Sequence, residues 1–386
     1  MSRPASAAVL TALLLLAGLS GCGGEDATPQ TGGGSSAAAG EPIRLGSLAP
    51  ISGRNSSSGE AMVNAAKLAV AEVNAAGGVL GRQVELVAED DACDPGTAVT
   101  AAQTVVKKDV AAFVGGYCSS AMVPTLKIFH DAGVPMIIAL ANSTDLLDPG
   151  YNSLFLICGT VTAEAEFAVD WMEKLDGTRL SVVHDGTSFP ITLADSTAAY
   201  ARKTGKLKVA GELKLSQGAA DYRRTALSII GSKADIVYYT GYYGEANQLI
   251  KDLRGAGFTG KIVVGDGATD GPLLENLTAA ESRDVYGTAM LVPEFMPELK
   301  GWSERYKAAY GIDPGPSTAE SYDAVMVAVE AIKRAGNVDR EAIRTALGDT
   351  DYSGLSGPMT FNDDGTRKTP KFLLLKADGK ELKLVS

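Results

Sequence analysis

The stretch Gly115-Gly116-Tyr117-Cys118-Ser119-Ser120 lies between a short apolar run and a helical pattern. Residues 110–114 predict a buried strand, and residues 121–130 predict a helix. The turn therefore sits where free backbone N–H groups and the helix dipole favour an anion such as a carboxylate. The paired glycines let the backbone come close to a ligand, and two serine hydroxyls add donors. Taken alone, the stretch also fits an ordinary strand-to-helix turn with a serine cap.

Strands and helices alternate along most of the chain, which predicts an α/β protein with parallel sheets covered on both faces. The units are too many for one sheet, so we expect two doubly wound, Rossmann-like lobes. The helices and strands expected after about Met290 would let the chain cross between the lobes several times, which predicts a multi-strand hinge. Lobe 1 is expected at 42–158 plus 290–358, and lobe 2 at 159–289 plus 359–386. The expected strands are 43–49, 83–88, 111–115, 134–140, 154–157, 179–183, 207–213, 235–239, 261–264, 359–361 and 371–376, and the expected helices are 59–76, 95–108, 121–132, 162–175, 191–204, 221–231, 244–256, 299–310, 317–335 and 339–347.

The start of the chain reads as an export signal rather than as part of the fold. Arg3 precedes an apolar run at 7–19 that is short for a membrane span. Leu19-Ser20-Gly21-Cys22 follows and is typical of a lipoprotein box, in which Cys22 is lipidated. The alternative is a plain signal peptide with an unrelated cysteine. Residues 1–22 are thus a predicted lipoprotein signal, and the Gly- and Ser-rich residues 23–41 a flexible tether.

Composition and charge exclude several classes of partner. The chain has 386 residues and a formal net charge of -11, without a basic cluster, so nucleic acid is not an expected partner. No CxxC is present and the only histidines, His130 and His184, lie far from the cysteines, so neither a metal site nor a cofactor is predicted.

Asp94 before Pro95 predicts a capped helix start. A calcium loop is the alternative for residues 89–95, but the twelve-residue pattern is missing.

Export implies an oxidising compartment, and three cysteines remain beyond Cys22. Any two of Cys93, Cys118 and Cys158 can pair, and the number of cysteines alone does not show which two do so.

Four turns are expected at the carboxyl ends of parallel strands, where open α/β sheets bind ligands. They offer donors for a carboxylate, an acid for a cation and aromatic walls, a set that suits a zwitterion such as an amino acid. Asp266 between two glycines also fits a simple turn residue. The four turns are 118–120, 140–142, 239–243 and 265–267.

Several motifs resemble the leucine/isoleucine/valine-binding proteins of branched-chain amino-acid ABC importers, which have the type I periplasmic-binding fold. The resemblance runs from about Ile43 to the C-terminus, and the two cysteine motifs at their spacing carry most of it. The matching stretches are Asp90-Asp91-Ala92-Cys93-Asp94-Pro95, Cys118-Ser119-Ser120, Val182-Val183-His184-Asp185, Val237-Tyr238-Tyr239-Thr240-Gly241-Tyr242 and Gly265-Asp266-Gly267.

The resemblance implies roles for individual residues. Cys93 and Cys118 would form a disulfide and leave Cys158 free. Ser119 would hold the ligand carboxylate through its hydroxyl and backbone N–H. Leu140 stands where the family uses a backbone carbonyl for the α-ammonium, and Asn142 where it uses a threonine. Tyr242 and Asp266 would come from the second lobe, with Asp266 in place of the family's usual glutamate and paired with the ammonium after closure.

The sequence departs from the family in the expected side-chain pocket. That pocket is expected at Ser58, Tyr117, Phe189 and Ser317, and the two serines stand where the leucine-binding relatives carry aromatic residues. Their loss predicts a larger, more polar pocket, unless another aromatic fills the space. Leu156-Ile157-Cys158 also replaces the family's usual arginine-containing stretch. An amino acid or close analogue is therefore expected rather than a branched-chain one in particular.

The resemblance implies a lipid-anchored, extracytoplasmic solute-binding lipoprotein. It would be a monomer that delivers an amino acid to the transmembrane subunits of an ABC permease. The alternative is a ligand-sensing receptor component that binds an amide or another small polar solute. An enzyme is a third class, but no nucleophile elbow is present outside the signal, and His184 beside Asp185 has no evident nucleophile.

Overall fold

A computed structural model describes residues 40–269 and 272–385 of the chain. The predicted signal at 1–22, with Cys22, and most of the predicted tether at 23–41 lie outside these ranges. Within the described ranges, no helix combines the length and apolar character that a membrane span requires. The same ranges contain no group of His, Cys, Asp and Glu side chains suited to a metal ion.

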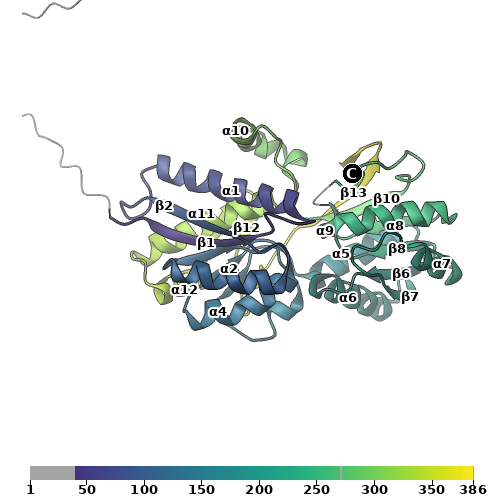
Figure 1. The fold of residues 1–386 in the computed structure, drawn as a ribbon, viewed down its shortest axis with the longest axis horizontal. Coiled ribbons are helices and arrows are strands. Elements are labelled where there is room, and N and C mark those ends of the chain that lie inside the picture. Colours follow the sequence, from purple (N-terminus) through teal and green to yellow (C-terminus); the bar gives the residue numbers. More distant parts are fainter. Residues whose placement is uncertain (1–39, 270–271, 386) are drawn as a thin grey trace, which may run out of the picture. The chain divides into compact units, whose positions relative to one another are not determined.

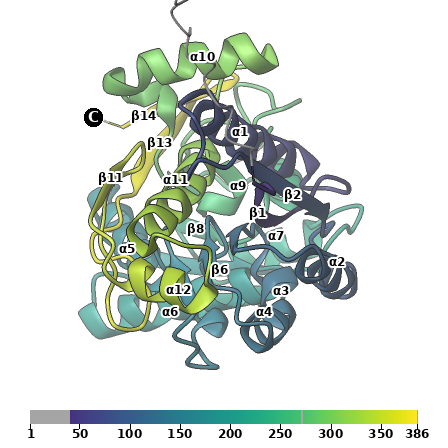
Figure 2. The same ribbon diagram turned by 90° about the vertical axis from the view of Figure 1, so that its left-hand side faces the viewer.

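The first sheet is entirely parallel, with strand order β2-β1-β3-β4-β5. Helices α1 and α11 pack side by side on one face, and α2 covers the other (Figures 1 and 2). The short helices α3 and α4 pack beside α2, and α12 packs against α11. The bounds are β1 Ile43–Ala49, α1 Ser56–Ala75, β2 Val84–Asp90, α2 Pro95–Lys107, β3 Ala112–Gly115, α3 Ser119–Met122, α4 Leu126–Asp131, β4 Met136–Ile138, β5 Leu154–Leu156, α11 Thr318–Ala335 and α12 Arg340–Gly348.

The second sheet has the order β14-β13-β10-β9-β8-β6-β7. Its strands β6 to β10 are parallel, whereas β13 runs antiparallel to β10 and β14 antiparallel to β13. Helices α5 and α6 pack together on one face, and α7 and α8 on the other (Figure 1). The bounds are α5 Val161–Lys174, β6 Arg179–His184, α6 Ser188–Thr204, β7 Lys208–Lys214, α7 Arg223–Gly231, β8 Ile236–Tyr239, α8 Tyr243–Gly255, β9 Lys261–Val264, α9 Asp266–Thr269, β10 Val285–Ala289, β13 Leu373–Asp378 and β14 Glu381–Leu384.

The chain passes between the two sheets three times. It crosses after β5, after β10 on the way to α10 (Lys300–Tyr310), and after the small hairpin β11 (Tyr352–Gly354) and β12 (Gly357–Met359). The buried side chain of Arg367 ties two crossings together, because its Nη1 donates to the Ile157 carbonyl at 2.9 Å and its Nη2 to the Ser356 carbonyl at 2.7 Å. Two doubly wound sheets with a three-segment connection confirm the predicted two-lobed α/β fold.

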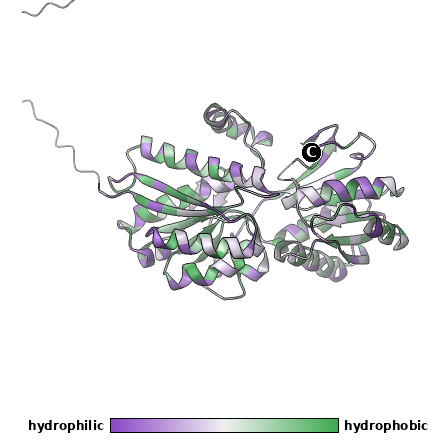
Figure 3. Ribbon diagram, in the orientation of Figure 1, coloured by the Kyte–Doolittle hydropathy of each residue, from purple (hydrophilic) through white to green (hydrophobic). Residues whose placement is uncertain are grey.

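The hydropathy of the elements explains the layering. The strands are mostly apolar, whereas the helices carry apolar and polar residues on different faces (Figure 3). In β3 and β4 every residue is buried, as expected for parallel strands covered on both sides. This burial holds the carboxyl ends of the strands, and the loops that follow them, in fixed positions.

Three predicted features differ from the structure. The helix expected at 121–132 is α3, a 3₁₀ turn at Val123–Thr125 and then α4, because Pro124 lacks the N–H that a continuous helix needs there. The second sheet is not wholly parallel, since β13 and β14 form an antiparallel edge. Finally, the strand expected at 359–361 is β12, which lies in a separate hairpin with β11, and β10, β11 and β14 were not predicted.

Candidate functional site

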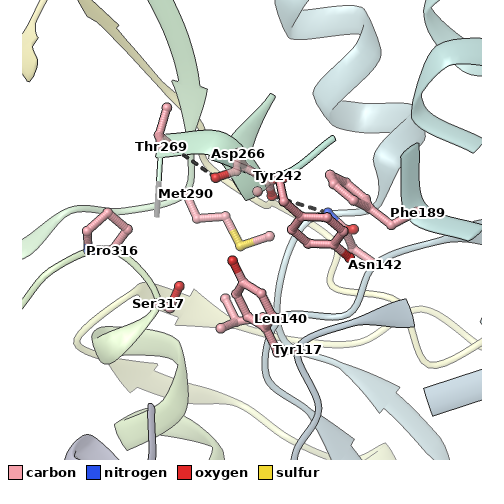
Figure 4. Close-up of a pocket in the computed structure, with 11 residues that line it drawn as sticks. Tyr117, Leu140, Asn142, Phe189, Tyr242, Asp266, Thr269, Met290, Pro316 and Ser317 are labelled. Atoms are coloured by element: carbon pink, nitrogen blue, oxygen red, sulfur yellow. Dashed lines mark hydrogen bonds between the residues drawn. The ribbon is translucent and has the colours of Figure 1, made fainter. Parts of the chain in front are cut away.

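A cavity lies where loops from both sheets meet. Its lining residues surround about 380 Å³ of space that no atom fills, a volume that includes open solvent. Figure 4 shows side chains from the loops of both sheets around this space. Those on the side of the first sheet follow β3 and β4 or directly precede α11, and those on the side of the second sheet follow β6, β8, β9 and β10. The lining residues are Tyr117, Leu140, Asn142, Phe189, Tyr242, Asp266, Gly267, Thr269, Met290, Pro316 and Ser317.

The glycine pair after β3 brings this turn close to its neighbours. Gly116 has φ +88°, a region that glycine adopts without strain, and its N–H donates to the Leu48 carbonyl at 2.9 Å. A Cβ on Gly115 would lie 2.5 Å from the Ser47 hydroxyl. The turn therefore requires both glycines, because they come close to Ser47 and Leu48 of β1; the close approach to a ligand remains a prediction.

Ser119 is buried behind the cavity and is not among its lining residues. Its Oγ accepts hydrogen bonds from the backbone N–H groups of Asn142 and Ser143, each at 3.2 Å. Helix α3, which begins at Ser119, has only four residues, so its dipole is much smaller than that of the continuous helix predicted. Ser119 thus joins the turn after β3 to the turn after β4, and it supports Asn142.

Asp266 begins α9, next to the second sheet, and contacts a residue that follows the first sheet. Its Oδ2 accepts a hydrogen bond from Asn142 Nδ2 at 3.4 Å, a contact drawn in Figure 4. The backbone of Asp266 is held on both sides. Its N–H donates to Glu164 Oε1 at 2.9 Å, and its carbonyl accepts from the Thr269 hydroxyl at 2.9 Å. The structure therefore brings Asn142 and Asp266, predicted from separate motifs, to one place.

Aromatic rings form one wall of the cavity. The Tyr242 ring lies 5.7 Å from the Phe189 ring and 6.0 Å from the Tyr117 ring, between centroids. Burial, together with nearby carboxylates such as Asp185 and Asp266, holds the pKa of Tyr242 well above its usual value. Tyr242 is therefore a neutral phenol that can donate a hydrogen bond.

The other expected pocket residues divide between lining and support. Ser317 lines the cavity, with φ +71° at the start of α11. Ser58 is buried in the first turn of α1 and is not among the lining residues. Sequence reasoning missed Met290 and Pro316, which add apolar surface near Ser317 (Figure 4). It placed Gly267 in the expected turn 265–267, but it missed Thr269, which follows that turn closely.

The cysteines lie beside this site. The sulfur atoms of Cys93 and Cys118 are within bonding distance, and their Cα atoms are 5.3 Å apart, inside the usual range for disulfides. Cys158 is a buried free thiol 3.6 Å from the Ala141 carbonyl oxygen. Burial raises the pKa of Cys158 strongly, so this thiol is unreactive at neutral pH.

The chain is similar to several known binding proteins. An amino acid binding protein of Pseudomonas aeruginosa is 29% identical over 88% of this chain and 91% of that one. The Leu/Ile/Val-binding protein BraC3 of Rhizobium johnstonii is also 29% identical, over 86% of this chain and 91% of its own. Among solved structures, the branched-chain amino acid transporter substrate-binding protein LivJ of Streptococcus pneumoniae, in complex with isoleucine, matches with a TM-score of 0.80. It is 25% identical and covers 89% of this chain and 99% of its own.

The match to a family covers nearly all of the described residues. Residues 42–381 match the periplasmic binding proteins, a family of solute-binding proteins rather than of enzymes. The two doubly wound sheets, the three crossings between them and the cavity lined from both sides agree with that match. The chain belongs to the periplasmic binding protein family.

Proposed function

We propose that this protein is an extracytoplasmic solute-binding protein of an ABC importer that captures an amino acid and delivers it to the permease. The observation that carries the proposal is the contact between Asn142 and Asp266 at the cavity. This contact places the carboxylate of Asp266, next to the second sheet, beside the side-chain amide of Asn142, next to the first sheet. The similarity to amino-acid-binding relatives supports the same ligand class.

The chemistry of the cavity suits a zwitterion with an apolar or mixed side chain. Asp266 would pair with the ligand ammonium, and Asn142 and the Tyr242 hydroxyl would act as donors to its carboxylate. Leu140, Met290 and the aromatic wall would contact the side chain. Because these groups come from both lobes, the ligand binds the closed state better than the open one and shifts the population toward it.

The remaining sequence-based assignments belong to this proposal. Cys22 would carry the lipid that holds the protein at the membrane, and residues 23–41 would be the tether. Lobe 1 would comprise 42–158 plus 290–358, and lobe 2 would comprise 159–289 plus 359–386. The protein would act as a monomer, because the two lobes of one chain complete the site.

A disulfide between Cys93 and Cys118 would lock the loop after β2 to the turn after β3. In the chain-entropy account, a loop with a sequence separation of 25 residues is worth roughly 3–4 kcal/mol. Thiol counting on unfolded protein that starts after Cys22 should find one reactive cysteine, Cys158. Three reactive cysteines in protein prepared under oxidising conditions would refute the disulfide.

The ligand class is tested by a thermal-shift screen of residues 42–386 against amino acids, amides, polyamines, sugars and small carboxylic acids, followed by calorimetry. An amino acid should raise Tm by an amount set by its concentration over Kd. Asp266→Asn should then weaken its binding about 10- to 100-fold, because a buried hydrogen bond to a charged group is lost.

The control is Asp363→Asn, since Asp363 is exposed and is not among the residues that line the cavity. It should bind like the wild type. A thermal shift with an amide or a sugar, but with no amino acid, would contradict the proposal and favour the receptor alternative.

A further inference from the structure

Glu164 is a wholly buried carboxyl group behind the ligand site. It lies in the first turn of α5, just after the first crossing between the sheets, and its exposed fraction is 0%. It does not line the cavity, and the sequence motifs gave it no role. A buried acid at this place needs an explanation, because burying a charge is costly unless the charge is compensated.

One oxygen of Glu164 holds three elements of the second lobe together. Its Oε1 accepts from the Asp266 N–H at 2.9 Å, from the Thr288 hydroxyl at 2.6 Å and from the Tyr238 hydroxyl at 3.2 Å. These donors belong to α9, β10 and β8. The carboxyl therefore determines where the backbone of Asp266 lies relative to the sheet.

Among the residues that the structure describes, the groups that face Glu164 supply no positive charge. Its three donors are a backbone amide and two hydroxyls, all neutral. The ionisable neighbours are Asp266 on α9 and Tyr238 on β8, while α6 contributes the apolar Leu193 next to Gly265. Burial raises the pKa of Glu164, and its hydrogen bonds with Thr288, Asp266 and Tyr238 only partly oppose that rise.

Two adjacent carboxylates without a cation between them cannot both be ionised at low cost, and such pairs retain a proton. A ligand ammonium brings one positive charge, which one carboxylate neutralises. A second ionised carboxylate would leave a buried, uncompensated charge in the loaded site. The geometry therefore favours a state in which one of the two acids, Glu164 and Asp266, is charged and the other is neutral.

We propose that Glu164 is a positioning residue that remains protonated, so that Asp266 presents a single negative charge to the ligand cation. This inference rests on the proposed function for the identity of the ligand group. The neutral acid keeps the hydrogen bonds that hold α9, β8 and β10. The site is thereby matched to ligands with one cationic group near Asp266.

Three variants separate the proposed role from its alternatives. With the amino acid found in the screen, Glu164→Gln should bind within about threefold of the wild type at pH 7, because the amide is neutral and its oxygen can accept the same bonds. Glu164→Ala should lose about tenfold or more, because Asp266 loses its backbone acceptor. Asp266→Asn should lose at least as much.

Rescue by glutamine but not by alanine supports positioning by a neutral group. A loss in Glu164→Gln as large as that in Asp266→Asn would overturn the proposal, since it would mean that Glu164 supplies negative charge. Full affinity in Glu164→Ala would overturn the positioning role.

A second experiment uses no ligand, so it remains valid if the proposed function fails. It compares the unfolding of the wild type and Glu164→Gln by urea from pH 4 to 8. Since the folded-state pKa of Glu164 is raised, its contribution to stability is complete below the unfolded-state pKa of about 4.3. That contribution declines as pH rises toward the folded-state pKa.

The glutamine variant should therefore gain stability relative to the wild type as pH increases, while titrating groups that do not interact with Glu164 cancel in the difference. A difference that is flat across the range, or that changes in the opposite direction, would overturn the retained proton.

Discussion

Asp91 is a second wholly buried acid, located directly after β2 in the first lobe. Its Oδ1 accepts from the Cys93 N–H at 2.8 Å, whereas no partner for Oδ2 exists among the described residues. Burial, with a smaller contribution from the charge of Asp90, raises the pKa of Asp91 to about 6. Ionisation of the buried Asp91 carboxyl group therefore lowers the stability of the folded protein.

Asp91→Asn should remove the contribution that Asp91 makes to the pH dependence of stability. Because the folded-state pKa is raised, the wild-type group contributes its full stability below about pH 3.9 and loses it as pH rises through about 6. The unfolding free energy of the variant, minus that of the wild type, should rise by about 3 kcal/mol between pH 3 and 7. Any constant cost of the buried amide cancels in this rise. Urea unfolding at several pH values measures it, and a difference that does not change with pH would contradict the expectation.

The site could be predicted from the sequence where a residue follows a buried strand directly. Tyr117, Leu140, Tyr242 and Asp266 all do so, and all line the cavity. Ser119 shows the limit, because the partners of its hydroxyl are N–H groups in another loop. Met290 also follows a buried strand, but that strand, β10, was not predicted. Pro316 precedes α11 in the segment that returns to the first sheet, so its position depends on the path of the whole chain.

At the scale of elements, local chemistry explains most boundaries. Asp94 accepts from the Thr97 N–H at 2.7 Å and starts α2 before Pro95, as predicted. Thr160 and Asp339 cap α5 and α12 in the same way. These ends depend on side chains a few residues away, so a sequence contains the information needed to find them.

Elements that depend on distant partners were predicted less well. Strand β10 pairs with β9 on one side and β13 on the other, and its residues Val285–Ala289 lack the long apolar run of the earlier strands. The edge strand β14 alternates and is largely exposed, so its pattern is weak. The direction of β13 follows from the third crossing, which delivers the chain to the sheet from the opposite end. Pattern alone does not contain that information.

At the scale of the whole molecule, contacts outside the cavity also join the two lobes. Arg54, in the loop before α1, forms a salt bridge with Glu245 in the first turn of α8, with 2.9 Å between Nη1 and Oε1. The Gly218 N–H donates to the same oxygen at 3.0 Å, and the Tyr243 hydroxyl donates to the Arg54 carbonyl. The Ser188 hydroxyl donates to Asp145 at 2.6 Å. The Gly218 bond lies within the second lobe, whereas the bonds of Arg54 and Ser188 connect the two lobes, in addition to the three crossings and the Asn142–Asp266 contact.

Removing the Arg54 side chain should therefore speed ligand release. The arginine is 63% exposed and the glutamate 7%, so the pair is worth no more than about 1 kcal/mol, or roughly a two- to fivefold increase in Kd. Most of this should appear in the dissociation rate, because the salt bridge forms only when the lobes are together.

Stopped-flow measurement of ligand release from Arg54→Ala tests this expectation. Lys127→Ala is the matched control, since Lys127 pairs with Asp131 inside α4 alone. If both variants release ligand at the wild-type rate, the salt bridge does not favour closure. If Arg54→Ala instead changes only the association rate, Arg54 acts by attracting the ligand and not by holding the lobes together.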